Sequence, residues 1–304
     1  MALLSHTLGF DKQPMTVTCM TDYIQAHCGV VLGQGRYGVV YQHGSEYAFK
    51  VVSRYQRIHN SEVRNNQNED REMLAQWFVK HPTLMQLLTV LQDDTQRGYL
   101  FPLAKAGDLM TLLMFTGSLQ HDRFITLSLR IASGLLKLHS SSIAHRDVKP
   151  DNILLMAAEA PIATAVLADF GSATFGAAPR SGCTELTGTF AYWAPELFAV
   201  QATRRESYGY QVDCWSLGVS LYSACCGMPP FDDASSQYEE PSYVLDITDS
   251  TWQSLRAPVR NTLSALLAVD DAIRCSCKNV IEHLGDVAQY STSLSAHSVC
   301  GSTS

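Results

Sequence analysis

The chain has 304 residues, 46% of them hydrophobic and 17% charged, a composition typical of a globular protein with one or two hydrophobic cores. Its net charge of −7 argues against a nucleic-acid-binding or anionic membrane-binding surface and favours basic peptides as partners. No apolar run reaches the roughly 18 residues of a membrane span, so none is expected, and the first ten residues lack a signal-peptide pattern. The nine cysteines lack zinc-finger spacing, which indicates a reducing intracellular compartment.

The sequence becomes strand-like from Ile24 and carries a glycine motif, Gly33-Gln-Gly35-Arg-Tyr-Gly38, between two apolar segments, residues 30–32 and 39–41. Dinucleotide-binding folds use the same glycine spacing but continue into a helix, whereas the β-branched residues after Gly38 predict a hairpin. Glycines there let backbone N–H groups approach phosphates without a Cβ in the way. The motif therefore favours a flap over a nucleotide, and a plain β-hairpin is the alternative.

A third strand is predicted over residues 47–52, and Lys50 lies in it, where a lone ammonium group among apolar residues needs a partner. Residues 61–79 are predicted to contain a helix with three candidate partners, Glu62, Glu69 and Glu72. A solvated charge on the helix surface is the alternative for Glu69 and for Glu72.

Two further strands are predicted over residues 84–91 and 99–103, joined by the polar turn of residues 92–98. Residues 108–116 and 122–139 then show the apolar spacing of helices.

The loop of residues 145–152 reads His-Arg-Asp-Val-Lys-Pro-Asp-Asn and precedes a short apolar strand. It carries a carboxylate (Asp147), an ammonium (Lys149) and an amide (Asn152) within six residues. Phosphoryl transfer to a hydroxyl needs such a set: an acceptor orients the nucleophile, a cation faces the migrating group and a neutral oxygen binds a metal ion. A chance polar loop is the alternative for the His-Arg-Asp triplet alone.

A strand is also predicted over residues 163–167, directly before Asp169-Phe170-Gly171. The Asp169 carboxylate and the Asn152 amide oxygen suit Mg²⁺, which prefers hard oxygen ligands and keeps several waters. Residues 172–187, rich in Gly, Ala, Ser and Thr, have the composition of a mobile segment.

In this order the motifs resemble those of the eukaryotic-type serine/threonine protein kinases, over about residues 24–285, and Lys149 is typical of the serine/threonine branch. The resemblance implies an α+β fold of two lobes with ATP between them. The small lobe would be an antiparallel sheet with one main helix, and the larger lobe would be mostly helical. The expected boundaries are an N-terminal arm (1–23), a small lobe (24–102), a hinge (102–106), a large lobe (107–285) and a Ser/Thr-rich disordered tail (286–304).

The resemblance also implies a role for each polar residue of these motifs. Asp147 would orient the substrate hydroxyl and accept its proton, Lys149 would stabilise the transferring phosphoryl group, and Asn152 and Asp169 would hold Mg²⁺. Lys50 would position the α- and β-phosphates and pair with Glu72, Glu69 being the second choice. The residues implied in ATP binding are Leu32, Gly33, Gly35, Gly38, Val40, Ala48, Lys50, Glu72, Phe101, Pro102, Ala104, Asp108 and Leu154.

Residues 188–196, Gly-Thr-Phe-Ala-Tyr-Trp-Ala-Pro-Glu, resemble the substrate-docking loop of these kinases. By the same resemblance, Asp213 would accept N–H groups from the backbone near His145 and Arg146. Arg274 would pair with Glu196, as geometric support more than as a gain in stability.

Residues 172–187 correspond to the activation segment. Glu185 lies four residues before Thr189, where many relatives carry a phosphothreonine, so its charge could pair with Arg146 without modification. On this hypothesis, replacing Glu185 with alanine removes much of the activity. A solvated glutamate is the alternative, and Thr184 and Thr187 remain candidate phosphorylation sites.

Asp108 and Asp151 correspond to positions that contact arginines before the phosphoacceptor in basophilic relatives. The expected partners are therefore protein substrates that carry basic residues N-terminal to the acceptor. Binding of ribose hydroxyls by Asp108 and capping of the loop by Asp151 are the alternatives. The sequence contains no signal for an oligomeric state.

Residues 100–109 resemble, more narrowly, the serine/threonine kinases encoded in the unique short region of alphaherpesvirus genomes. That resemblance implies a host-cell location, in the cytoplasm or nucleus.

Two other functions remain open. A pseudokinase usually lacks one of the catalytic or metal-binding residues, and none is lost here. A small-molecule kinase would not need the docking loop and the Arg274 segment.

Overall fold

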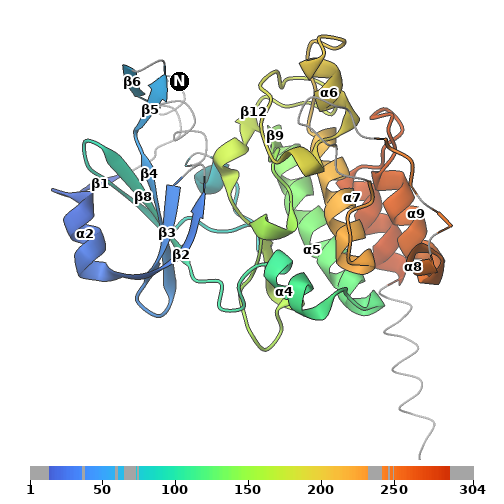
Figure 1. Ribbon diagram of the computed structural model, residues 1–304, viewed down its shortest axis with the longest axis horizontal. Helices are drawn as coiled ribbons and strands as arrows, with labels where there is room; N and C mark the ends of the chain where they lie inside the picture. The colour runs from blue at the N-terminus through green and yellow to red at the C-terminus, as the bar shows by residue number, and fades with distance from the viewer. Residues whose placement is uncertain are drawn as a thin grey trace, which may run out of the picture. The chain divides into compact units, whose positions relative to one another are not determined.

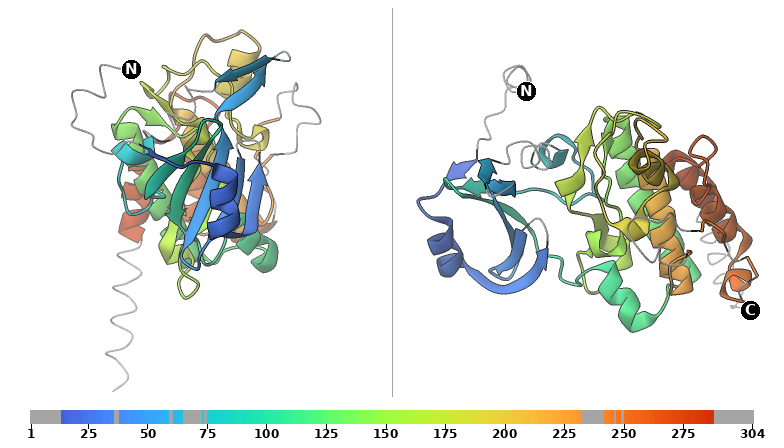
Figure 2. Two further views of the ribbon diagram at one scale, coloured as in Figure 1. Left: turned by 90° about the vertical axis from the view of Figure 1, so that its left-hand side faces the viewer. Right: turned by 45° about the horizontal axis from the view of Figure 1, so that its top comes forward.

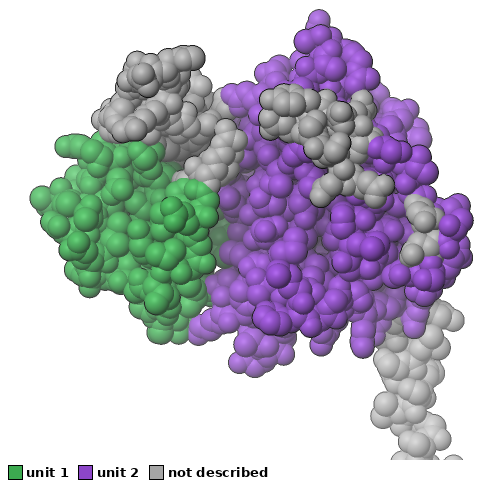
Figure 3. Space-filling view, in the orientation of Figure 1, with its two compact units in different colours: residues 1–77, 85–103 green, residues 78–84, 104–304 purple. Residues whose placement is uncertain are grey.

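The computed structural model describes residues 14–35, 38–58, 61–64, 73, 75–231, 242–245, 247–248 and 250–287. The chain divides into two compact units, residues 1–77 with 85–103 and residues 78–84 with 104–304 (Figure 3). The first unit is built mainly on a sheet and the second mainly on helices (Figure 1). The expected α+β class, with one sheet-based and one helical part, is thereby confirmed.

The first unit contains a six-stranded sheet in the order β1-β7-β8-β4-β3-β2. Neighbouring strands are antiparallel except for the parallel pair β1 and β7. The glycine motif forms the end of the β2–β3 hairpin, where Gly35 pairs with Gly38. The strands are β1 (Met15–Thr16), β2 (Cys28–Gly35), β3 (Gly38–His43), β4 (Tyr47–Ser53), β7 (Thr89–Gln92) and β8 (Gln96–Pro102).

Helix α2 (Met20–His27) lies against the sheet (Figure 2), in a segment that was expected to be partly an arm and partly strand-like. Its apolar side chains recur with helical spacing, and Met20 is fully buried against Phe49 and Val51 of β4. The carboxylate of Asp93 accepts the backbone N–H of Met20 at 2.7 Å and so satisfies one donor of the first turn.

A second feature that was not expected is the antiparallel hairpin of β5 (Tyr55–Ile58) and β6 (Ser61–Arg64). Its second strand lies at the start of residues 61–79, which were expected to contain a helix. Helical structure follows later, at residues 75–78. Glu69 and Glu72, two candidate partners of Lys50, lie outside the described residues, and β6 contains the third, Glu62.

The second unit is organised around α7 (Gln211–Cys226), in which nearly every residue is buried. It packs beside α5 (His121–Ser140) and against α9 (Ala257–Leu266) (Figure 2). Because α7 is surrounded by protein, residues on all its faces can support other parts of the unit. The remaining helices are α4 (Leu109–Thr116), α6 (Pro195–Gln201), α8 (Ser250–Ser254) and the helical residues 277–287.

The second unit also contains short strands and 3₁₀ turns. The strand β10 (Ile153–Leu155) pairs with β11 (Ala165–Leu167), and β9 (Ile143–Ala144) pairs with β12 (Thr174–Phe175). The 3₁₀ turns are η1 (Pro150–Asn152), η2 (Ile162–Thr164), η3 (Phe170–Ser172) and η4 (Phe190–Tyr192). Among the described residues, no helix combines the length and apolar character that crossing a bilayer requires.

Candidate active site

The carboxylate of Asp147 is the centre of a polar cluster in the second unit. Its Oδ1 accepts hydrogen bonds from the backbone N–H of Thr189 at 2.9 Å and from the Thr189 hydroxyl at 2.7 Å. Its Oδ2 accepts from the Asn152 amide at 3.0 Å and lies 3.3 Å from the Lys149 ammonium. Two other residues of the loop 145–152, Lys149 and Asn152, and one residue of the docking loop therefore converge on one carboxylate.

The Thr189 hydroxyl lies between two groups of opposite charge. It donates to Asp147 and accepts from the Lys149 ammonium at 2.6 Å. The sequence placed Thr189 in the docking loop but gave it no role of its own. Gly188 allows the docking loop to come this close, because it has a φ of 92° and a Cβ there would collide with the carbonyl oxygen of Arg146.

The buried carboxylate of Asp213 supports the backbone before Asp147. It accepts the N–H of His145 at 2.8 Å, the N–H of Arg146 at 2.7 Å and the His139 Nε2 at 2.9 Å. Arg146 has a φ of 67°, a conformation that non-glycine residues rarely adopt without such support. Burial alone would raise the pKa of Asp213, but the hydrogen bonds that it accepts and the electrostatic effect of the neighbouring His139 and His145 lower it below its ordinary value. The expected role of Asp213 as acceptor is confirmed.

The donor set of Asn152 and Asp169 fits a hard cation. The Asn152 Nδ2 donates to the Asp147 carbonyl oxygen at 2.8 Å and to its carboxylate, which directs the amide oxygen away from both. The backbone N–H of Ala168 donates to the Asn152 carbonyl at 2.8 Å, so the residue before Asp169 is bonded directly to Asn152. Asp169 itself has the left-handed conformation with φ 59° and caps η3 through Gly171. These two residues would hold Mg²⁺, as the sequence predicts.

The guanidinium of Arg146 reaches the activation segment. Its Nε donates to the Ser172 carbonyl at 2.6 Å, and its Nη1 donates to the Tyr208 hydroxyl at 3.2 Å and the Glu185 carbonyl at 3.3 Å. The Tyr208 hydroxyl in turn donates to the Glu185 carbonyl. The expected ion pair of Arg146 with Glu185 is present at 3.5 Å, with the Glu185 side chain 55% exposed. The bridging hydroxyl of Tyr208 was not anticipated from the sequence.

The end of the docking loop is fixed by a buried bidentate ion pair. Arg274 Nη1 and Nη2 donate to the two carboxylate oxygens of Glu196 at 2.6 and 2.9 Å, and both side chains are buried. The guanidinium also lies 5.1 Å from the centre of the Trp215 ring. The predicted pair is confirmed.

Within the first unit, the structure places the predicted phosphate-binding residues on three adjacent strands. Lys50 is buried in β4, between Val40 on β3 and Tyr99 on β8. Gly33 and Gly35 have open space where a Cβ would lie, whereas a Cβ on Gly38, at φ 145°, would collide with the Val51 carbonyl. Leu32 lies on β2, Ala48 on β4, and Phe101 and Pro102 on β8. Glu72 lies outside the described residues, so its pairing with Lys50 stays a prediction.

The remaining predicted nucleotide contacts belong to the second unit. The backbone N–H of Ala106 donates to the Leu155 carbonyl at 3.0 Å, and Asp108 pairs with Leu154 in an isolated bridge, so Ala104, Asp108 and Leu154 lie on neighbouring segments. The Asp108 carboxylate caps α4, because it accepts from the Thr111 N–H at 2.7 Å and the Thr111 hydroxyl at 2.9 Å. Its proposed contacts with nucleotide or substrate stay predictions.

Comparisons with known proteins agree with this geometry. A family model described as the protein kinase domain matches residues 27–284. A probable serine/threonine-protein kinase of Dictyostelium discoideum, fhkE, is 32% identical over 84% of the chain and 37% of its own length. The human serine/threonine-protein kinase DCLK3 is 26% identical over 90% of the chain and 42% of its own length.

A third relative is nearer in length. An Aurora kinase of Dictyostelium discoideum is 30% identical over 89% of the chain and 67% of its own length. The chain thus spans less than half of the first two relatives and two thirds of the third. Because the family model covers most of the chain and the catalytic geometry is assembled in the same residues, the chain belongs to the protein kinase family.

Proposed function

We propose that the chain is an ATP-dependent serine/threonine protein kinase that transfers the γ-phosphate of ATP to serine and threonine hydroxyls of proteins. The observation that carries the proposal is the Thr189 hydroxyl, which lies 2.7 Å from the Asp147 carboxylate and 2.6 Å from the Lys149 ammonium. A substrate hydroxyl in the same surroundings would be oriented by the carboxylate and would attack phosphorus beside the ammonium.

In this proposal each residue of the cluster has one task. Asp147 orients the attacking hydroxyl and takes its proton, and Lys149 stabilises the charge on the transferring group. Asn152 and Asp169 hold Mg²⁺, which supplies charge neutralisation on the phosphates when bound. Lys50 binds the α- and β-phosphates, and the glycines of the β2–β3 hairpin provide backbone N–H groups for them.

The test is Mg²⁺-ATP phosphorylation of a peptide array by the wild-type chain and by Asp147→Asn. Loss of the acceptor should lower turnover on the order of a hundredfold or more while the fold, checked by circular dichroism, is kept. Glu282→Gln is the matched control, since it makes the same chemical change at an exposed helix position. Equal, background-level transfer by wild type and Asp147→Asn would favour a pseudokinase that binds nucleotide without turnover.

The proposed substrates carry arginine two to three residues before the acceptor. Asp151 supports this more than Asp108 does: Asp151 is exposed beside the catalytic residues, whereas both Asp108 oxygens already accept from Thr111. Because Asp151 is exposed, we expect Asp151→Ala to weaken the arginine preference by at most about 1 kcal/mol, and by less at high salt. An array in which acidic or proline-directed peptides win would overturn the preference and leave the kinase assignment intact.

An intracellular location, in the cytoplasm or nucleus, and a viral source are also proposals. The eight cysteines in the described residues are all free thiols, which supports a reducing compartment. The likeness of residues 100–109 to alphaherpesvirus kinases supports a host cell as that compartment. Imaging of a fluorescent fusion in mammalian cells would test the location, and confinement to the secretory pathway would contradict it.

A further inference from the structure

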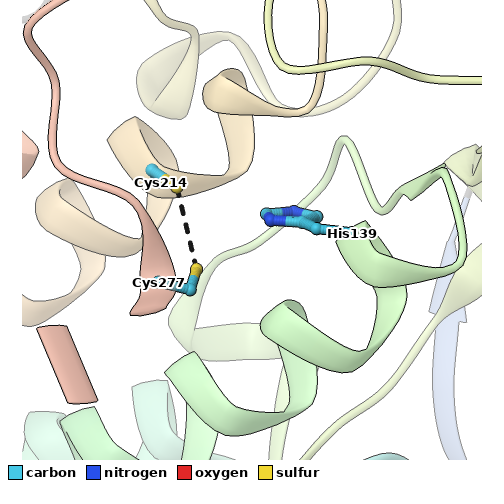
Figure 4. Close-up of side chains that lie close together, drawn as sticks. All are labelled: His139, Cys214 and Cys277. Carbon is cyan, nitrogen blue, oxygen red and sulfur yellow. Dashed lines mark hydrogen bonds between the residues drawn. The ribbon is translucent and has the colours of Figure 1, made fainter. Parts of the chain in front are cut away.

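A cluster of three possible metal ligands lies buried in the second unit, apart from the residues proposed to hold Mg²⁺. It consists of His139 in the last turn of α5, Cys214 in the first turn of α7 and Cys277 at the start of the helical residues 277–287 (Figure 4). One ligand atom from each lies within 4.8 Å of the other two, and all three side chains are buried. Within the described residues it is the one such group of His, Cys, Asp and Glu.

The hydrogen bond of His139 selects the nitrogen that can bind a metal ion. Its Nε2 lies 2.9 Å from the Asp213 carboxylate, which also accepts two backbone N–H groups. An ionised carboxylate can only accept hydrogen bonds, so Nε2 carries the hydrogen and Nδ1 keeps its lone pair. Metal-binding histidines usually donate their other N–H to a carboxylate in this way. The Tyr210 ring, stacked 4.3 Å away, fixes the plane of the imidazole.

The two sulfur atoms are spaced as ligands of one ion. Two sulfur–zinc bonds of about 2.3 Å at a tetrahedral angle place the sulfur atoms about 3.8 Å apart. The observed distance between the Cys214 and Cys277 Sγ atoms is 3.7 Å (Figure 4). Two thiolates also balance the double charge of Zn²⁺, so the complex with a neutral imidazole has no net charge. That balance matters because all three ligand side chains are buried.

We propose that His139, Cys214 and Cys277 form a structural zinc site. Binding of one Zn²⁺ replaces the two thiol protons, which are released to solvent, and forms two sulfur bonds and one nitrogen bond, with a water as fourth ligand. The ion would join α5, α7 and the helical residues 277–287. Because His139 is also hydrogen-bonded to Asp213, the bound ion would restrict the motion of Asp213, which supports the backbone of residues 145 and 146.

The first test is the zinc content of the untagged chain, purified from zinc-supplemented cells and dialysed against metal-free buffer. Wild type and Cys275→Ser should hold about one zinc per chain, whereas the double variant Cys214→Ser/Cys277→Ser should hold roughly tenfold less. Cys275 is the matched control because it lies two residues from Cys277 but outside the cluster. Zinc retained by the double variant, or lost equally by Cys275→Ser, would overturn the site.

The second test does not depend on a variant that folds. Cobalt replaces zinc in wild type, and thiolate ligation gives a sulfur-to-cobalt charge-transfer band that an unliganded thiol cannot give. The same sample is analysed by mass spectrometry for a Cys214–Cys277 disulfide. The site is contradicted if wild type takes up neither zinc nor cobalt, if bound cobalt lacks the band, or if the two cysteines are oxidised to each other. None of these readouts uses kinase activity.

Discussion

Arg146 belongs to the catalytic loop, residues 145–152, and contacts two carboxylates in very different surroundings. One supports the backbone of the loop, and the other lies in the activation segment. On the side of the catalytic loop, Asp213 is fully buried and accepts the Arg146 backbone N–H at 2.7 Å. On the side of the activation segment, Glu185 is half-exposed and its carboxylate lies 3.5 Å from the guanidinium. Water competes with the second contact and not with the first. We infer that the loop keeps one conformation while the segment is adjustable.

The largest effect that tests this comparison is expected from Asp213→Asn. The amide would turn an N–H₂ group toward backbone N–H groups and leave buried donors unsatisfied, so the free energy of unfolding should fall by about 3 to 5 kcal/mol. Turnover should fall on the order of a hundredfold, because the Arg146 backbone relaxes and displaces Asp147. Urea unfolding and peptide kinetics measure both, with Glu282→Gln as the exposed control. A near-normal variant would show that the loop does not depend on this support.

A smaller loss, confined to stability, is expected from Glu196→Gln. The substitution leaves Arg274 buried without its counter-charge, which should cost about 3 kcal/mol in urea unfolding. The double variant Glu196→Leu/Arg274→Met removes both charges and should be more stable than the single variant. A double variant that is less stable than the single variant would show that the ion pair itself adds to the free energy of unfolding.

Tyr208→Phe should have an intermediate effect on activity, because it removes the hydroxyl that joins Arg146 to the Glu185 carbonyl. Loss of a buried hydrogen bond of about 1 kcal/mol corresponds to a roughly fivefold lower kcat/KM, with the urea midpoint shifted only slightly. Tyr210→Phe is the control, since the Tyr210 ring stacks on His139 without contacting Arg146. Equal losses in the two variants would argue against a specific bridge.

The smallest effect is expected from Glu185→Ala, although the sequence alone suggested a large one. An ion pair at 3.5 Å with a half-exposed partner contributes at most about 1 kcal/mol, so activity should fall no more than about fivefold, and less in high salt. Bacterially made, phosphatase-treated wild type should remain active. Silencing by phosphatase would show that Thr184 or Thr187 carries the activating charge instead.

The order of the motifs along the sequence is enough to predict part of the site, including the contacts of Asp213 and Arg274. It misses Thr189 and Tyr208, because the partner of a hydroxyl depends on distances of a few tenths of an ångström that no spacing encodes. It also does not predict the hairpin of β5 and β6, since the Gln, Arg and Glu in that segment suit a helix as well as a hairpin. The cysteines of the proposed zinc site come together only through the packing of three distant segments.

The Asp147 carboxylate has room for about four hydrogen bonds; it already accepts two from Thr189 and one from Asn152, and the Lys149 ammonium lies 3.3 Å away. A substrate hydroxyl that takes the surroundings of the Thr189 hydroxyl therefore exchanges with that resident donor, which lies 2.7 Å from Oδ1. One hydrogen bond replaces another, so the acceptor hydroxyl adds little to ground-state affinity and acts mainly in the transition state. A peptide with alanine in place of the acceptor serine should accordingly bind within about twofold of the substrate, as measured by competition. Recognition of the substrate would then depend on its flanking residues, and the hydroxyl would contribute to the rate of transfer.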